Sequence, residues 1–168
     1  RRIYMDALIQ YRAGNIYPEA NGTLRLSFGK VEGFNPEDGA VYLPQTTLGG
    51  MAAKVRGAPF HAPARVLEEV PNAPRSRWSD PSLGDVPVDF LTTLDNTGGS
   101  SGSPVMNAHG AFVGITFDRN WEAVAADWMY DPELTRSIHV DVRYLLWSLD
   151  QVEHASVLLA EMGVERGR

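Results

Sequence analysis

A glycine-rich turn at Thr97–Pro104 constrains the fold of this chain more than any other stretch. It reads Thr-Gly-Gly-Ser-Ser-Gly-Ser-Pro, a composition that flexible linkers share. A linker does not explain the ordered pattern that follows, which is a short strand at 104–106, a turn at 107–110 and an apolar strand at 112–117. The turn is therefore predicted to be rigid and to connect strands of a β-rich fold.

Ser101 in this turn is the candidate nucleophile. A serine that attacks a carbonyl must project its hydroxyl from a rigid, exposed turn, with backbone N–H groups beside it to bind the oxyanion that forms. Gly99 can adopt a conformation that residues with a Cβ avoid, so that its N–H and that of Ser101 point at one position. Gly102 leaves room for an acyl group. Ser101 is thus predicted to be catalytic, and Gly99 to belong to an oxyanion hole.

Two other glycine-rich motifs do not fit this stretch. The nucleophile motif Gly-x-Ser-x-Gly fails because Ser103 stands where its last glycine should be. A phosphate-binding loop fails because no lysine follows the glycines. The order of nucleophile turn, short strand, hairpin and cleft-lining strand is instead that of the second barrel of a chymotrypsin-like peptidase.

Length and composition fit one domain without a covalent or metal-based scaffold. The chain has 168 residues, with 15 Lys and Arg against 21 Asp and Glu and a net charge of −6, which argues against a nucleic-acid partner. It has no cysteine, so disulfides and thiolate zinc sites are excluded. No stretch reaches the roughly 18 apolar residues of a membrane span, and no cofactor or metal is expected.

Helices are expected at the two ends of the chain and strands between them, which gives a mainly β fold with terminal helices. Residues 1–14 are expected to be the tail of a helix that begins upstream and ends near Gly14, because no capping residue precedes them; we therefore expect a fragment of a longer protein. Period-two patterns and apolar runs predict strands at 23–28, 41–42, 86–91, 112–117 and 137–142, and further helices at 64–70, 143–149 and 155–162.

Two other stretches carry weaker signals. Gly49 and Gly50 are predicted to form a turn between two strands, in preference to a ligand-binding loop. Residues 60–87 are rich in proline and are predicted to be a surface excursion in which Trp78 is held in place.

Five segments together resemble a known family: Asn21–Arg25, Thr46–Gly50, Thr97–Pro104, Gly114–Glu122 and Val140–Tyr144. On these segments the chain resembles the bacterial serine dipeptidyl-peptidases of the dipeptidyl-peptidase 7 and dipeptidyl-peptidase 11 type, and the resemblance covers most of the chain. One departure is Ser100, since the family usually has asparagine just before the nucleophile. That side chain need not take part in catalysis.

The resemblance implies a chymotrypsin-like double β-barrel with an inserted helical domain, in a periplasmic or cell-surface enzyme several times longer than this chain. Such an enzyme releases dipeptides from the free N-terminus of peptide substrates, and a homodimer is compatible with it. The family's histidine and aspartate partners of the nucleophile lie nearer the N-terminus. Residues 1–168 would then be the C-terminal part of the peptidase domain, and this chain would be inactive by itself.

Asp118 and Arg119 carry the prediction of specificity. An exopeptidase needs an anion for the substrate's α-ammonium group, and Asp118 matches the family's amine-binding aspartate. An arginine can pair bidentately with an acidic P1 side chain. The family has glycine at this place in members that prefer apolar P1 residues and arginine in those that prefer Asp or Glu, so Arg119 indicates acidic P1. Two alternatives stay open: a solvated Asp118–Arg119 ion pair, and the glycine-bearing subgroup, which residues 120–123 resemble more closely.

The remaining titratable residues are given structural roles. Surface or core positions, and no catalytic role, are expected for all four histidines: His61, His109, His139 and His154. Solvated positions and helix caps, and no calcium site, are expected for the acids Asp118, Glu122, Asp127 and Asp131, whose spacing matches no EF-hand. A non-catalytic peptide-binding domain and a chymotrypsin-like endopeptidase remain as alternative functions.

Overall fold

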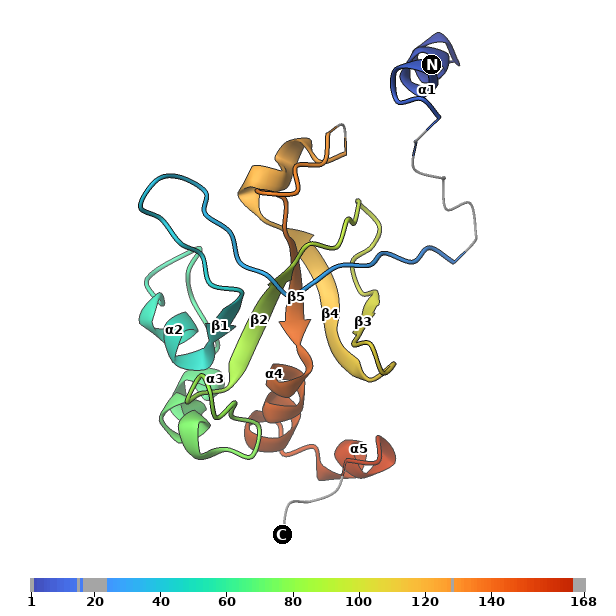
Figure 1. The fold of residues 1–168 in the computed structure, drawn as a ribbon. Helices are drawn as coiled ribbons and strands as arrows, with labels where there is room; N and C mark the ends of the chain where they lie inside the picture. The colour runs from blue at the N-terminus through green and yellow to red at the C-terminus, as the bar shows by residue number, and fades with distance from the viewer. Residues whose placement is uncertain (1, 15, 17–23, 128, 165–168) are drawn as a thin grey trace.

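A five-stranded antiparallel sheet forms the centre of the computed structural model, which describes residues 2–14, 16, 24–127 and 129–164. The strands are β1 (Gln45–Thr47), β2 (Pro87–Thr92), β3 (Pro104–Met106), β4 (Phe112–Arg119) and β5 (Ser137–Asp141). They lie in the order β1-β2-β5-β4-β3, so the last strand of the chain is the middle one (Figure 1). The sheet confirms the predicted β-rich class. Its closure into a chymotrypsin-like barrel stays a prediction.

The described part of the chain also contains short helices, most of which lie around this sheet (Figure 1). They are α1 (Arg2–Tyr11), α2 (Leu48–Ala53), α3 (Ala64–Glu69), η1 (Val70–Arg75), η2 (Trp121–Ala125), α4 (Val142–Trp147), η3 (Ser148–Val152) and α5 (Ser156–Glu161). The helices predicted at 64–70, 143–149 and 155–162 are confirmed to within about two residues. Asp141 begins α4, because its side chain accepts a hydrogen bond from the Arg143 N–H at 2.9 Å.

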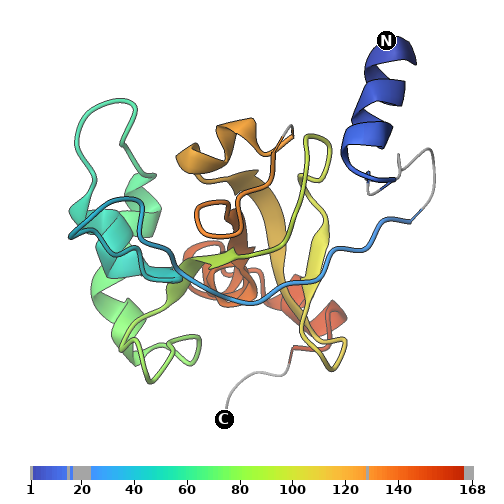
Figure 2. The same cartoon turned by 45° about the horizontal axis from the view of Figure 1, so that its top comes forward.

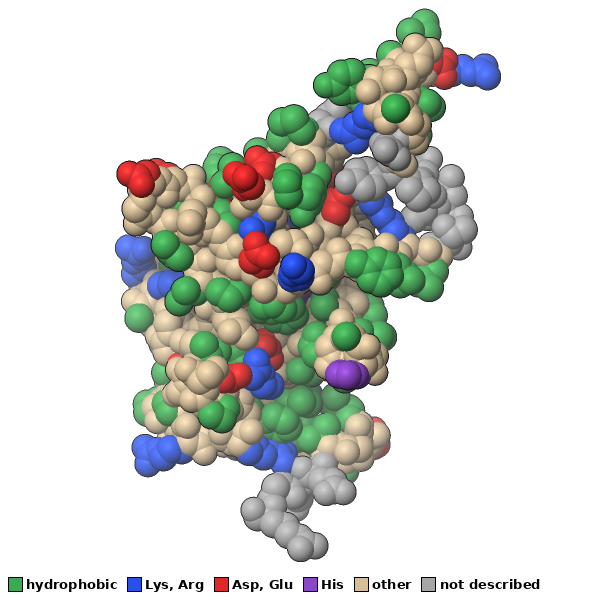
Figure 3. Space-filling model, viewed as in Figure 1, with side chains coloured by type: hydrophobic (Ala, Val, Ile, Leu, Met, Phe, Trp, Pro, Cys, Tyr) green, Lys and Arg blue, Asp and Glu red, His purple; other side chains and the backbone are tan. Residues whose placement is uncertain are grey.

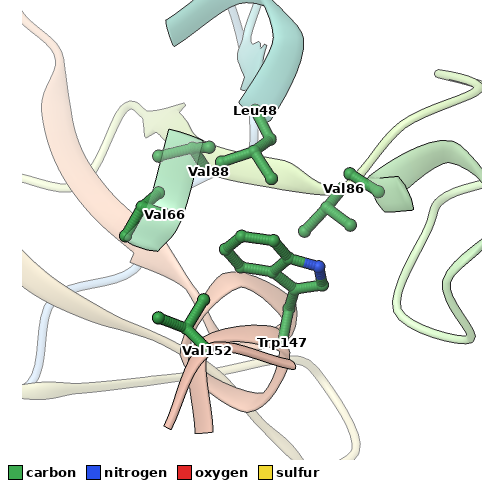
Figure 4. Close-up of a cluster of buried hydrophobic side chains, with 7 residues drawn as sticks. Leu48, Val66, Val86, Val88, Trp147 and Val152 are labelled. Atoms are coloured by element: carbon green, nitrogen blue, oxygen red, sulfur yellow. The ribbon is translucent and has the colours of Figure 1, made fainter. Parts of the chain in front are cut away.

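The main hydrophobic core lies between β2, α2, α3 and α4, around the fully buried Trp147 (Figure 4). Val66 and Ala73 contribute to it, so the prediction that residues 60–87 are a surface excursion is wrong. Two apolar residues within a proline-rich stretch gave too weak a pattern to reveal this burial. Trp78 is held in place, as predicted, because its Nε1 donates to Asp150 Oδ2 at 2.9 Å.

Trp147→Ala is expected to lower the free energy of unfolding by about 3–5 kcal/mol, because it empties the centre of this core. The measurement is urea unfolding followed by circular dichroism. Trp121→Ala makes the same change at a side chain that is 84% exposed, and it should cost no more than about 0.5 kcal/mol. Similar losses for the two variants would contradict this description of the core.

Gly49 and Gly50 lie in the first turn of α2, so the predicted turn between two strands is wrong. The Thr47 side chain accepts a hydrogen bond from the Gly50 N–H at 3.2 Å, and Asp85 Oδ2 accepts one from the Gly49 N–H at 2.8 Å. A Cβ at Gly49 would lie 2.9 Å from that carboxylate oxygen, so a larger residue would push the Asp85 side chain away from the Gly49 N–H. The sequence did not reveal the helix because a capping partner lies 36 residues away.

The alternating segment 24–28 is not a strand in the described residues, and Thr23 lies outside them. The side chains of Leu24 and Phe28 are 88% and 86% exposed, so the apolar face of this segment is not covered by other described residues. The chain instead runs irregularly beside the end of β2, with single hydrogen bonds such as Thr93 N–H to Lys30 O at 3.0 Å. The expected strand at 41–42 is likewise a single bridge between Phe34 and Tyr42.

Helix α1 ends where the sequence predicted, since the chain turns at Gly14 with a φ of 85°. None of its residues is buried, and both ribbon views show it away from the sheet (Figures 1 and 2). Hydrophobic side chains lie on its surface (Figure 3), among them Ile3 and Tyr11.

Candidate active site

The turn between β2 and β3 is built by two glycines in the left-handed region. Gly99 has a φ of 98° and Gly102 a φ of 89°, conformations that a Cβ disfavours. The N–H of Ser100 donates to Thr97 O at 3.1 Å, and the N–H of Ser103 donates to Ser100 O at 3.0 Å. These bonds make two successive tight turns, so the segment is ordered and is not a free linker. Ser101 is exposed at its tip.

The backbone amides of Gly99 and Ser101 have no hydrogen-bond acceptor in the described part of the chain. The N–H groups of Ser100, Gly102 and Ser103 all donate to carbonyl oxygens, whereas within the described residues no hydrogen bond engages those of Gly99 or Ser101. An exposed hydroxyl next to unsatisfied amides can act in acyl transfer, where such amides stabilise the negative oxygen of a tetrahedral intermediate.

Strand β4 holds the turn on the C-terminal side of Ser101, at Gly102 and Ser103. Thr116 O accepts a hydrogen bond from the Gly102 N–H at 2.8 Å, and the Thr116 N–H donates to Ser103 O at 2.9 Å. Ser101 Oγ itself donates to Phe117 O at 3.3 Å. The register with β5 shifts between Thr116 and Asp118, which makes Phe117 the extra residue of a β-bulge. The bulge is the reason the Phe117 carbonyl faces the serine instead of a neighbouring strand.

Asp118 and Arg119 directly follow this bulge, at the end of β4. Asp118 is exposed, and its Oδ1 accepts a hydrogen bond from the backbone N–H of Arg119 at 2.8 Å. Arg119 Nη1 donates to Asp127 Oδ1 at 2.8 Å and to Asn96 O at 3.4 Å. The guanidinium therefore pairs with Asp127, and the alternative of an Asp118–Arg119 ion pair is not what the structure shows.

Asp127 lies next to the site, and the sequence did not assign it a role there. Its carboxylate was expected to be solvated, and its side chain is indeed 51% exposed, but it pairs with an Arg119 side chain that is only 20% exposed. Helix η2 reverses the chain between the two residues, and the spacing of eight positions gives no local signal of that contact. The other side of the guanidinium, Nε and Nη2, has no partner among the described residues.

His139 is a buried structural residue, as predicted. Its Nε2 lies 2.6 Å from Thr92 Oγ1 and its Nδ1 lies 3.0 Å from Thr116 Oγ1, so both ring nitrogens are occupied. Burial lowers the pKa of His139 to about 4, which keeps the imidazole neutral at pH 7. In the described part of the chain no histidine is hydrogen-bonded to Ser101.

The pKa of Asp89 on β2 is shifted upward, whereas that of His139 is shifted downward. Burial raises the pKa of its carboxyl group to about 6, with Asp141 adding to the shift and Lys54 opposing it. On acidification from pH 6.5 towards pH 4, the unfolded chain binds a proton at His139 before the folded one does, which lowers stability. Asp89 is protonated first in the folded chain, so it raises stability on acidification between about pH 6 and pH 4.

Asp89→Asn is therefore expected to raise the free energy of unfolding by about 2 kcal/mol at pH 7, with the gain disappearing near pH 4. The variant should also lose stability more steeply than the unchanged protein between pH 6.5 and pH 4, because only the His139 effect remains. Urea unfolding at several pH values measures both. A gain that is the same at pH 7 and pH 4 would contradict the raised pKa of Asp89.

The Asp131 side chain caps backbone N–H groups near the site. Asp131 Oδ1 accepts hydrogen bonds from the N–H groups of Glu133 and Leu134, at 2.8 and 3.3 Å, which is a capping role.

Among the described residues, no three His, Cys, Asp or Glu side chains gather in a way that could hold a metal ion. Of the helices in the described ranges, none has the length and apolar character to cross a membrane.

Known proteins share this fold and sequence. The family model described as Peptidase S46 matches residues 1–164, and the chain belongs to the peptidase S46 family. It is 40% identical to an Asp/Glu-specific dipeptidyl-peptidase of Shewanella putrefaciens, over 97% of this chain and 26% of that protein. It is 42% identical to dipeptidyl-peptidase 7 of Phocaeicola vulgatus, over 88% of this chain and 20% of that protein.

A solved structure gives the same result for the fold. The chain superposes on the crystal structure of Porphyromonas endodontalis DPP11 in complex with the dipeptide Arg-Glu with a TM-score of 0.85 and 34% identity, over 97% of this chain and 24% of the other. The family resemblance predicted from the sequence is confirmed. The chain spans about a quarter of the length of the relatives it matches.

Proposed function

We propose that this chain carries the nucleophile and part of the substrate-binding site of a serine exopeptidase that releases dipeptides from the free N-terminus of peptides. The observation that carries the proposal is the turn at 97–103, where an exposed Ser101 lies next to two unused amides and β4. The names of the S46 relatives, which are dipeptidyl-peptidases, support the same reaction.

In the proposed reaction, Ser101 Oγ attacks the carbonyl carbon of the second residue of the substrate and transfers its proton to a general base. The amides of Gly99 and Ser101 bind the resulting oxyanion. The peptide C–N bond then breaks, its nitrogen takes the proton, and water later hydrolyses the acyl-enzyme to free the dipeptide and Ser101. We place the histidine and aspartate of the triad outside this chain, since His139 is occupied by two threonines.

Asp118 would bind the free amine of the dipeptide and Arg119 the side chain of its second residue. Asp118 is exposed and carries a carboxylate that can pair with the α-ammonium group. The unoccupied Nε and Nη2 of Arg119 form one edge of the guanidinium, and such an edge matches both oxygens of an Asp or Glu side chain. We therefore propose an acidic P1 preference, in a homodimeric protein of the periplasm or cell surface.

A pair of peptides with a free and an acetylated N-terminus tests this function, in a protein that joins this chain to the further regions of its longer relatives. Only the free peptide should be cleaved. Asp118→Asn should raise KM for it about ten- to hundredfold, because the charged hydrogen bond to the ammonium group is lost. Glu133→Gln removes the same charge from another exposed position and should leave KM unchanged.

The alternatives predict other results. Equal cleavage of the two peptides would identify an endopeptidase. Peptide binding without cleavage, and without reaction of Ser101 with a fluorophosphonate, would identify a non-catalytic peptide-binding domain.

A further inference from the structure

His139 lies at the place where three strands of the sheet meet the candidate active site. On β5 it pairs with Phe90 of β2 on one side and with Thr116 of β4 on the other. Its side chain is fully buried, on the face of β5 that also carries Ser137 and Asp141. A buried imidazole between two strands is in a position to fix their spacing.

One side of the imidazole is bound to the segment that leads into the nucleophile turn. Nε2 lies 2.6 Å from the hydroxyl of Thr92, the last residue of β2, and that hydroxyl also accepts a hydrogen bond from the Leu94 N–H at 3.3 Å. Ser137 Oγ donates to Leu94 O at 2.5 Å. The chain is thus fixed at 92–94, three residues before the turn begins at Thr97.

The other side of the imidazole is bound to the strand that holds the turn. Nδ1 lies 3.0 Å from the hydroxyl of Thr116, the residue whose backbone N–H and C=O hold Ser103 and Gly102. Thr116 also stands immediately before the bulge that presents Phe117 O to Ser101. A shift of Thr116 would therefore move Gly102 and Ser103, the two residues that follow the nucleophile.

The ring itself has little freedom to move. Phe90 packs against it with ring centroids 5.0 Å apart. The Phe90 ring in turn occupies the space over Gly114, where a Cβ would lie 2.6 Å from Phe90 Cε1. The imidazole is thus fixed by packing as well as by its two hydroxyl partners.

We propose that His139 is a positioning residue, which links Thr92 and Thr116 across the sheet and thereby sets the position of the Ser101 turn. The inference rests on the proposed function, since it takes Ser101 as the nucleophile. The ring nitrogens of His139 meet the hydroxyls of Thr92 and Thr116 and not that of Ser101. It acts through the two chain segments that enter and hold the turn.

Threonine variants test this link without emptying the core, in the same longer protein. Thr116→Val keeps the side-chain shape but removes the hydroxyl that meets Nδ1, whereas Thr116→Ser keeps the hydroxyl and removes the methyl group. The rate of Ser101 acylation by a fluorophosphonate and the kcat for a dipeptide substrate should fall about ten- to hundredfold in Thr116→Val, with KM changing less than about twofold. Thr116→Ser should restore both to within about threefold of the unchanged protein.

Val152→Ala controls for a loss of stability, because Val152 lies in the main core away from the turn. It should destabilise the protein and leave the acylation rate unchanged. Equal rates in Thr116→Val and Thr116→Ser, or a rate in Val152→Ala as low as that of Thr116→Val, would overturn the inference and leave the proposed function standing. An unchanged protein that does not react at Ser101 would overturn both.

Discussion

Ser101→Ala is expected to abolish fluorophosphonate labelling of the longer protein and to lower kcat for dipeptide release by about 10³-fold or more. The variant removes the atom that forms the acyl-enzyme, so the residual rate reflects substrate binding and the oxyanion hole only. It should fold normally, because Ser101 is exposed and its hydroxyl makes one weak hydrogen bond, of 3.3 Å, to Phe117 O. Mass spectrometry of the labelled peptide and initial rates measure the two effects.

Ser103→Ala is the matched control for this experiment. Ser103 lies in the same turn and is also exposed. Its N–H donates to Ser100 O and its C=O accepts from the Thr116 N–H, and alanine keeps both of these backbone groups. It should be labelled at a rate close to that of the unchanged protein. Labelling that persists in Ser101→Ala, or that disappears equally in Ser103→Ala, would contradict the assignment of the nucleophile.

The features that sequence analysis predicted correctly are those with a local cause. Strands at 86–91, 112–117 and 137–142 follow from apolar and alternating patterns that are set by their own residues. The positive φ of Gly99 follows from what glycine alone can adopt in a tight turn. Turn and strands together placed Ser101 beside β4, and its role as the nucleophile stays a prediction.

The features that were missed depend on contacts between distant residues. The Asp85 side chain accepts a hydrogen bond from the first turn of α2, although it lies 36 positions along the chain from Gly49. Asp127 meets Arg119 only because η2 reverses the chain between them. The exposed alternation at 24–28 shows the reverse error, since a period of two predicts a strand only where another surface covers one face. The bulge at Phe117 likewise depends on pairing with β5, which the residues of β4 alone do not determine.

The proposed acidic P1 preference rests on the guanidinium of Arg119, and Arg119→Gly is expected to reverse it. A bidentate pair with the substrate carboxylate is worth about 3 kcal/mol in a partly enclosed site, so kcat/KM for a Leu-Asp substrate should fall about 10²-fold. Asp127 would also lose its partner, and its remaining negative charge would repel an acidic P1 side chain further. A Leu-Phe substrate has no charge to lose, and it should gain from the space that the side chain leaves.

Arg119→Lys and the double variant Arg119→Gly/Asp127→Asn separate these two causes. Lysine keeps the positive charge but not the planar fork, so Leu-Asp cleavage should lie between that of the unchanged protein and that of Arg119→Gly. The double variant removes the leftover carboxylate charge, so it should recover part of the Leu-Asp activity if repulsion by Asp127 contributes. Initial rates with both substrates measure the preference. Faster cleavage of Leu-Phe than of Leu-Asp by the unchanged protein, or an unaltered preference in Arg119→Gly, would show that Arg119 does not bind the P1 side chain.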